Sequence, residues 1–151
     1  MKIGIHHLNS KVLLAPMAGT SDKPFRMMCR EQGAALTTSE MVVLQKHLLN
    51  TNKSKHRLDF SSEKSPISIQ IAGSEAEELA ESARQAVEFG ADIVDINMGC
   101  PAKKVCNKAA GSALMKNEKL VEDIIKSVVN AVDIPVTLKM RTGWDLSLIH
   151  I

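Results

Sequence analysis

The chain has 151 residues, of which 44% are hydrophobic and 24% charged, a balance typical of a globular domain and outside the disordered range. Its net charge of +2 is too small to indicate nucleic-acid binding, and its three cysteines, without paired spacing, argue against a disulfide framework or a zinc site. The polar N-terminus has no signal core and no apolar run could span a membrane, so we expect a cytoplasmic protein that binds neither membrane nor metal.

Five short apolar runs predict β-strands. They are nearly continuous and rich in aliphatic and β-branched residues, as strands buried on both faces of a parallel sheet are. In chain order they comprise residues 12–15, 35–38, 67–72, 92–96 and 135–140.

Helical patterns separate several of these strands. The first has Pro24 in its first turn and stops at Gly33, and the second begins with Ser74 and Glu77 at the spacing of a capping box. Asn117 is predicted to cap a third helix with an apolar face. The predicted helices cover residues 22–32 and 74–89, a segment after 117 and, with a weaker pattern, residues 41–50.

Alternating strands and helices predict right-handed βαβ units around a parallel sheet. About four and a half units are present, whereas a closed eight-unit barrel needs roughly 250 residues. A doubly wound open sheet would fit this length, but it requires a G-x-G-x-x-G loop after the first strand, where this chain has Pro16-Met17-Ala18-Gly19. We therefore expect an α/β fold, the truncated N-terminal part of a (β/α)8 TIM barrel.

The last six residues, Leu-Ser-Leu-Ile-His-Ile, differ in character from the preceding segment. One frame of a common transposon-end sequencing adapter would encode this hexapeptide. We therefore expect residues 1–145 to form the partial barrel and residues 146–151 to be a non-native tail.

Polar residues follow or interrupt the predicted strands at the end where a parallel barrel carries its active site. Gln70 could instead bond a neighbouring strand's backbone, Lys139 could pair with Glu40 or Asp95, and Cys100 could be a small buried hydrophobe. Together at one edge they favour a ligand site, because buried polar groups need partners. The candidates are Pro16, Met17, Ala18, Ser39, Glu40, Gln70, Asn97, Cys100, Lys139 and Arg141.

Cys100 lies between Gly99 and Pro101, so it is expected on a rigid turn rather than in a helix. A cysteine in such a loop can act as a nucleophile or as a proton donor. Because no histidine lies near it in sequence to act as a base, we favour the proton donor. Cys106, six residues further on, is interpreted as a structural bystander rather than a redox partner.

Two basic stretches contain no acidic residue, residues 41–58 and residues 96–117. Such stretches are either solvated surface loops or contacts to phosphate groups. Their basic residues are Lys46, Lys53, Lys55 and Arg57 in the first, and Lys103, Lys104, Lys108 and Lys116 in the second.

The stretch Asp95-Ile-Asn-Met-Gly-Cys-Pro-Ala-Lys-Lys-Val105 resembles the signature of the tRNA-dihydrouridine synthase family, most closely its bacterial B-type branch. Ala15-Pro-Met-Ala-Gly19, Gln70-Ile-Ala-Gly73 and Leu138-Lys-Met-Arg-Thr-Gly143 agree with the family in order and spacing. The resemblance covers roughly residues 1–145.

This resemblance implies a flavin-binding (β/α)8 barrel, followed by a helical tRNA-binding domain, that reduces the C5–C6 bond of uridines in tRNA. FMN would be the cofactor and NADPH its reductant, and the basic stretches would lie near the tRNA backbone. Cys100 would protonate C5, and Asn97 would position the flavin or the uracil. The remaining implied flavin-binding residues are Pro16, Met17 and Ala18 against the ring, with Gln70 and Lys139 at its polar edge.

Two alternatives remain open from the residues alone. Another FMN-dependent barrel acting on a small molecule, such as a dihydroorotate or enoate reductase, would explain the strand-end residues but not the lysine-rich cysteine loop. An inactive fragment is the second alternative. The modified uridine and the roles of Glu40, Arg141 and Cys106 stay open, and the sequence does not determine the oligomeric state, which we expect to be a monomer.

Overall fold

Five parallel strands lie side by side in chain order in the computed structural model, which describes residues 1–43 and 57–143. They are β3 (Leu13–Leu14), β4 (Leu36–Thr37), β5 (Ser68–Ile71), β6 (Ile93–Met98) and β7 (Val136–Met140). β3 pairs with β4, β5 to β7 form one sheet, and parallel bridges from Thr38 to Ser68 and from Val42 to Ile71 connect the two. Successive units of a (β/α)8 barrel have this order, so the predicted α/β barrel part is confirmed; the described strands do not close into a full barrel.

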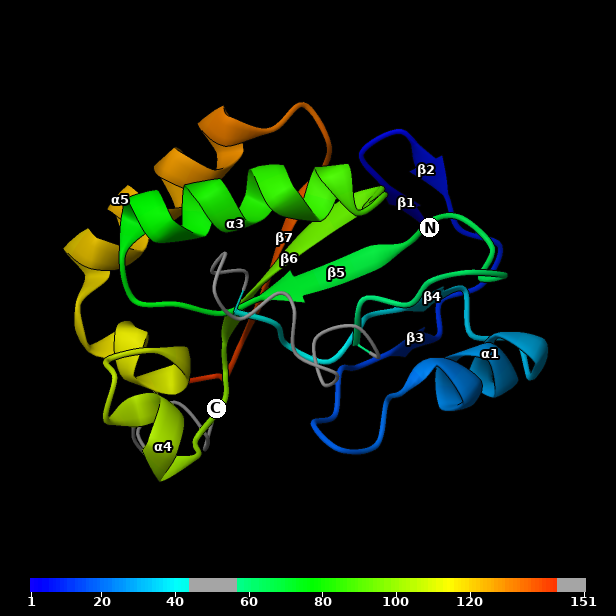
Figure 1. Ribbon diagram of the computed structural model, residues 1–151, viewed down its shortest axis with the longest axis horizontal. Helices are drawn as coiled ribbons and strands as arrows, with labels where there is room; N and C mark the ends of the chain where they lie inside the picture. The colour runs from blue at the N-terminus through cyan, green and yellow to red at the C-terminus, as the bar shows by residue number, and fades with distance from the viewer. Residues whose placement is uncertain (44–56, 144–151) are drawn as a thin grey trace.

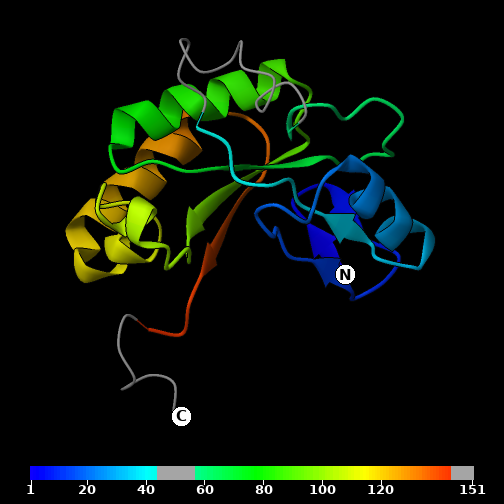
Figure 2. The same cartoon turned by 60° about the horizontal axis from the view of Figure 1, so that its bottom comes forward.

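Helices cover one face of the three-stranded sheet. α3 (Ala76–Glu88) and α5 (Glu118–Ala131) lie together along β5, β6 and β7, whereas α1 (Lys23–Glu31) lies beside β3 and β4 (Figure 1). Figure 2 shows the same division from another side. Beyond the tip of β6 come α4 (Lys103–Cys106) and the 3-10 helix η1 (Gly111–Lys116). None of the helices in the described part of the chain is long and apolar enough to cross a membrane.

The side chains of β5 and β6 alternate between an apolar and a polar face. Ile69 and Ile71 of β5 join Val94, Ile96 and Met98 of β6 in the core formed with α3 and α5. The residues between them point to the other face, because successive side chains of a strand alternate. These residues are also buried, and several are polar: Ser68, Gln70, Asp95 and Asn97.

The helix cap predicted at Asn117 is confirmed, and Asp22, for which no cap was predicted, caps α1. The Asp22 side chain accepts a hydrogen bond from Phe25 N at 3.1 Å, and the Asn117 side chain accepts one from Leu120 N at 3.1 Å. The capping box predicted at Ser74 is wrong. The backbone stays extended through the N-cap residue Glu75, whose side chain makes no capping bond, so the hydroxyl of Ser74 lies before the first turn.

A hairpin that the sequence analysis did not predict lies near the start of β6 and β7 (Figure 1). It consists of β1 (Lys2–Ile3) and β2 (His6–His7), and Gly4 between them packs so closely that a Cβ there would lie 2.2 Å from Pro135 Cγ. His6 Nε2 lies 3.2 Å from the carbonyl of Asp92. The hairpin thus covers the amino end of these strands, whereas the candidate residues follow the opposite end.

Two predictions concern segments that lie wholly or mainly outside the described residues. The proposed non-native tail at 146–151 is one of them. Most of the weaker helical segment at 41–50 is the other.

Candidate active site

The strand register aligns the polar residues of the sheet face opposite α3 and α5 in two rows. Gln70 of β5 pairs with Asp95 of β6, which pairs with Thr137 of β7, and one step further Asn97 pairs with Lys139. Asp95 accepts hydrogen bonds from Thr137 Oγ1 and from Gln70 Nε2, both at 2.6 Å. The first row is therefore a connected chain of hydrogen bonds across three strands.

Asn97 extends this chain to the cysteine loop. Its Nδ2 donates to Gln70 Oε1 at 2.8 Å, and its Oδ1 accepts from the backbone N–H groups of Gly99 at 3.3 Å and Cys100 at 3.2 Å. We call the series Asp95, Gln70 and Asn97 the buried relay; these side chains are 6%, 1% and 9% exposed. The relay leads from the middle of the sheet to the backbone of Cys100.

The carbonyl of Cys100 is held from its other side. It accepts hydrogen bonds from Ser112 N at 3.0 Å, Ser112 Oγ at 3.1 Å and Cys106 Sγ at 3.5 Å. Gly111 has φ +62°, and a Cβ there would lie 2.6 Å from the Cys100 carbonyl oxygen, so this close approach requires glycine. Cys100 thus lies on a fixed turn outside any helix, as predicted, and the residue is half-buried.

Burial raises the pKa of the Asp95 carboxyl above its ordinary value. The hydrogen bonds from Thr137 and Gln70 and the charge of Lys139 act in the opposite direction. The oxygen facing Gln70 accepts a hydrogen bond in either protonation state, provided that the proton resides on the oxygen facing Thr137.

The two cations of β7 and its following residues have different surroundings. Arg141 Nε donates to the carbonyl of Gly99 at 2.8 Å, which adds a third support to the cysteine loop. Lys139 is exposed and makes no ion pair among the described residues, while Glu40 pairs with Arg57 at 3.1 Å. The alternative in which Lys139 pairs with Glu40 is therefore wrong, whereas the charge of Lys139 acts on Asp95 without a direct ion pair.

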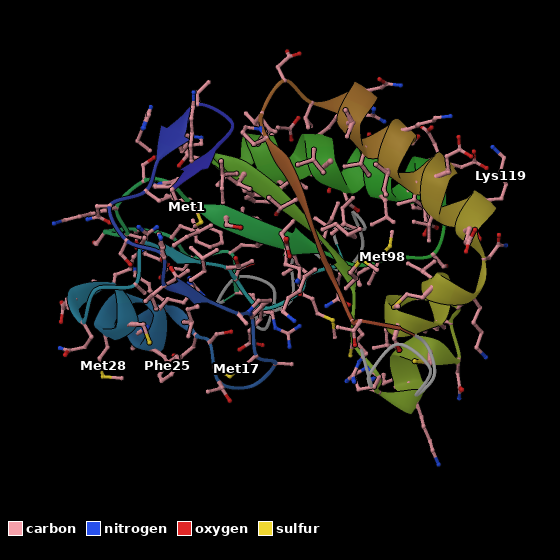
Figure 3. The ribbon with its side chains drawn as sticks, turned by 180° about the vertical axis from the view of Figure 1, so that it is seen from behind. Met1, Met17, Phe25, Met28, Met98 and Lys119 are labelled. Carbon is pink, nitrogen blue, oxygen red and sulfur yellow. The ribbon has the colours of Figure 1, made fainter. Side chains whose placement is uncertain are left out.

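Pro16, Met17 and Ala18 follow the carboxyl end of β3, where a tight turn begins at Met17. Ser21 closes it: the Met17 N–H donates to Ser21 Oγ at 2.8 Å, and Ser21 N and Oγ donate to the Met17 carbonyl. Figure 3 shows Met17 on this loop, apart from Met98 of the core. Within residues 1–43 and 57–143, no hydrogen bond links the turn to Gln70, Asn97 or Cys100.

The second basic stretch borders the cysteine loop. Lys103 and Lys104 lie on α4 and Lys108 follows it, and all three side chains are exposed. In the first stretch, residues 44–56 lie outside the described part of the chain, which includes Arg57.

Sequence reasoning missed Thr137, Gly111 and Ser112, and it considered Asp95 only as a partner for Lys139. One signal was available: the strands read Ser-Ile-Gln-Ile, Asp-Ile-Asn-Met and Thr-Leu-Lys-Met, so polar residues recur at every second position. This period places them on one face of a strand. Gly111 and Ser112 gave no such signal, because they meet Cys100 only through the return of the chain in η1.

A cavity of about 470 Å³ lies elsewhere, beside α1 and the segment before β5. Its lining includes His7, Met27, Arg30, Glu63 and Pro66. None of the candidate residues lines it, so the chemistry suggested by the sequence does not belong to this cavity.

Comparison with known proteins identifies the family. The family model described as dihydrouridine synthase matches residues 13–151. Proteins named tRNA-dihydrouridine synthase B from Xanthomonas campestris, Pseudomonas aeruginosa and Vibrio cholerae are 58%, 57% and 52% identical to the chain over 145 residues. These matches cover 96% of the chain but only 44%, 44% and 45% of the relatives, so the chain spans less than half the length of the curated relatives it matches. The chain belongs to the dihydrouridine synthase family.

Proposed function

We propose that the protein carrying this chain reduces uridine to 5,6-dihydrouridine in tRNA, with FMN as its bound cofactor and NADPH as the reductant. The observation that carries the proposal is the 52–58% identity, over almost the whole chain, to proteins named tRNA-dihydrouridine synthase B. The fixed cysteine turn at the carboxyl edge of the sheet supports it, because barrel enzymes place their reacting groups there.

The residues at this edge suit a flavin. The relay uses one hydrogen bond from the Gln70 amide nitrogen and one at its oxygen, and each atom can make another. Lys139 is exposed and makes no direct ion pair among the described residues, so it offers a positive charge for an anionic group. We assign flavin binding to Gln70, Asn97 and Lys139, with Pro16, Met17 and Ala18 providing contact to the ring.

Cys100 is proposed as the proton donor. Reduced FMN, when bound, supplies the hydride that C6 of the uracil ring receives. Negative charge then builds on the uracil and C5 requires a proton, which the Cys100 thiol can donate from a position fixed by its own backbone hydrogen bonds. The thiol needs no neighbouring base for this role, in contrast to a nucleophilic cysteine.

The exposed lysines beside Cys100 are proposed to contact the tRNA backbone. A uridine stacked within a folded tRNA must be turned outward before an enzyme can react with it. Positive charges next to the reacting group would bind phosphates on either side of that uridine. The lysines in question are Lys103, Lys104 and Lys108.

The test is an assay of the protein that carries this chain with FMN, NADPH and unmodified tRNA. Mass spectrometry of the digested nucleosides should reveal dihydrouridine. Reduction of small enones with tRNA left unchanged would instead identify a small-molecule reductase and contradict the proposal.

Flavin binding is tested separately with Lys139→Ala, which should lower the amount of FMN that remains bound during purification. Lys126→Ala is the matched control, because Lys126 lies on α5 and pairs with Glu122 on an exposed surface. Equal flavin content in the two variants would mean that Lys139 is wrongly assigned.

A further inference from the structure

The hydrogen bonds of the buried relay all run in one direction. The backbone N–H groups of Gly99 and Cys100 donate to Asn97, Asn97 donates to Gln70, and Gln70 donates to Asp95. Asp95 receives a second donor, Thr137, from the other side. The carboxyl of Asp95 is thus the final acceptor for donors that come from two sides.

The direction matters because Gln70 and Asn97 have amide side chains that can turn around. Each carries a donor at one end and an acceptor at the other. If Gln70 turned, Asn97 would have to turn as well, and its Nδ2 would then face the two backbone N–H groups of the cysteine loop. Two donors would meet, and the loop would lose its hydrogen bonds.

Asp95 prevents this reversal. An oxygen that only accepts faces Gln70 Nε2 at 2.6 Å, so the Gln70 amide has one favourable orientation and Asn97 follows it. Both side chains are almost fully buried. A buried polar group that loses its hydrogen-bond partner costs free energy, because water cannot readily take the partner's place. Within the described residues, Gln85 Oε1 is the one fully buried side-chain polar atom without a partner, so every buried polar atom of the relay has at least one partner.

We propose that Asp95 is a positioning residue that sets the direction of the buried relay and so holds the turn of Cys100 in place for proton transfer. It acts through Gln70 and Asn97 and does not itself touch the uridine. The catalytic part of this inference rests on the proposed function; the structural part, the hold on the Gly99 and Cys100 amides, does not.

The proposal makes different demands of different substitutions at position 95. Asp95→Asn keeps an oxygen for Gln70 and turns its nitrogen to Thr137, whose hydroxyl can accept as well as donate. Asp95→Leu keeps a similar volume but removes both acceptors. Asparagine should therefore preserve the relay and leucine should break it.

The experiment measures two quantities on the protein that carries this chain. Hydrogen exchange at the Gly99 and Cys100 amides reports the hold on the loop, and the rates of uridine reduction and of flavin reduction by NADPH report the two half-reactions. Asp95→Leu should lose exchange protection at both amides and slow uridine reduction about 10- to 100-fold, the order expected for a misplaced reacting group, with flavin reduction little changed. Asp95→Asn should resemble the wild type in all three.

Three results would overturn the proposal. Unchanged amide exchange in Asp95→Leu would show that Asp95 does not hold the loop. Lost exchange protection with an unchanged rate of uridine reduction would show that this hold does not matter for the reaction. A loss in Asp95→Asn as large as in Asp95→Leu would show that charge, rather than an acceptor, matters. Wild-type protein without dihydrouridine activity would overturn the proposed function, and with it the catalytic role, while the exchange measurement would still decide the structural part.

A second pair of variants decides the matter if Asp95→Leu does not fold. Gln70→Leu removes the link between Asp95 and Asn97 and should lose exchange protection at Gly99 and Cys100. Thr137→Val removes the other donor to Asp95 but leaves the hydrogen bond from Gln70, so it should keep that protection. Equal exchange in the two variants would contradict the proposal.

Discussion

This protein contains two buried polar networks that terminate on different kinds of group. The network around Arg26 joins α1 to the segment before β5: its guanidinium pairs with Glu63 and donates to the carbonyls of Ser21 at 2.9 Å and Asp59 at 3.3 Å. The ring of Phe60 lies 5.1 Å from the guanidinium carbon. The guanidinium of Arg26 thus donates to one carboxylate and two backbone carbonyls, which tie α1 to the segment before β5.

The buried relay around Asp95 begins in a similar way but ends at the turn of Cys100, whose residue is half-buried. Burial alone therefore does not distinguish a structural network from a functional one. What differs is the terminus: the Arg26 network closes on backbone carbonyls and one carboxylate, whereas the relay ends on the backbone N–H groups of Gly99 and Cys100, the proposed proton donor. The variants below separate the two kinds of network.

The largest expected effect is on the reaction, at the end of the relay. Cys100→Ala should slow uridine reduction by about 10² to 10⁴, the usual contribution of a general acid, because C5 would lack its proton donor. Flavin reduction by NADPH does not use this proton and should stay close to the wild-type rate. Stopped-flow flavin absorbance and nucleoside mass spectrometry measure the two steps.

Cys106→Ala is the control for this variant. The Cys106 thiol lies 3.5 Å from the Cys100 carbonyl, closer than its place in the sequence suggested, but Ser112 supplies two shorter hydrogen bonds to the same oxygen. Its removal should therefore have little effect on either step. A native rate in Cys100→Ala would mean that another group donates the proton.

The next effect is on stability, in the network that closes on itself. Arg26→Met leaves the buried carboxylate of Glu63 without its partner, which should lower the free energy of unfolding by about 3–5 kcal/mol. Arg84→Met is the control, since the pairs of Arg84 with Glu77 and Glu81 are exposed and their loss should change the free energy of unfolding far less. Urea titration distinguishes them, and a loss in Arg26→Met no larger than in the control would contradict a structural role.

These networks also mark what the sequence could predict. The strands followed from their apolar runs, α1 from Pro24 and Gly33, and α5 from an apolar face and from the cap at Asn117, which depends on a neighbour three residues away. Gln70 and Asn97 were identified as candidates because both lie near strand ends. Their contact with each other was not, because it depends on the register between β5 and β6.

Other features depended on contacts that no local pattern encodes. The β1–β2 hairpin has strands of two residues, too short to show a period. The Arg26 network brings together residues 37 positions apart. The proposed assignments of Pro16, Met17, Ala18 and Lys139 remain predictions, because they concern contacts to a cofactor.

A smaller effect is expected where η1 meets the cysteine turn. Gly111→Ala adds a Cβ at φ +62°, 2.6 Å from the Cys100 carbonyl, so it should cost about 1–3 kcal/mol of stability and also slow uridine reduction. Gly90→Ala is the control: its φ is +88°, but nothing lies within 4 Å of the added Cβ. Thermal melts and the tRNA assay on both variants isolate the effect of the contact with Cys100. A normal rate of uridine reduction in Gly111→Ala would show that this close approach does not matter for the reaction.

The smallest effect is expected at the helix caps, which belong to neither network. Asn117→Ala removes the hydrogen bond to Leu120 N and should lower the free energy of unfolding by about 1 kcal/mol. Ser74→Ala should change it far less, because the capping box at Ser74 is not formed and α3 begins after Glu75. Chemical denaturation of the two variants compares them directly. A loss of similar size in Ser74→Ala would mean that the hydroxyl caps α3 after all, and the extended backbone at Glu75 would then have to be abandoned as the start of that helix.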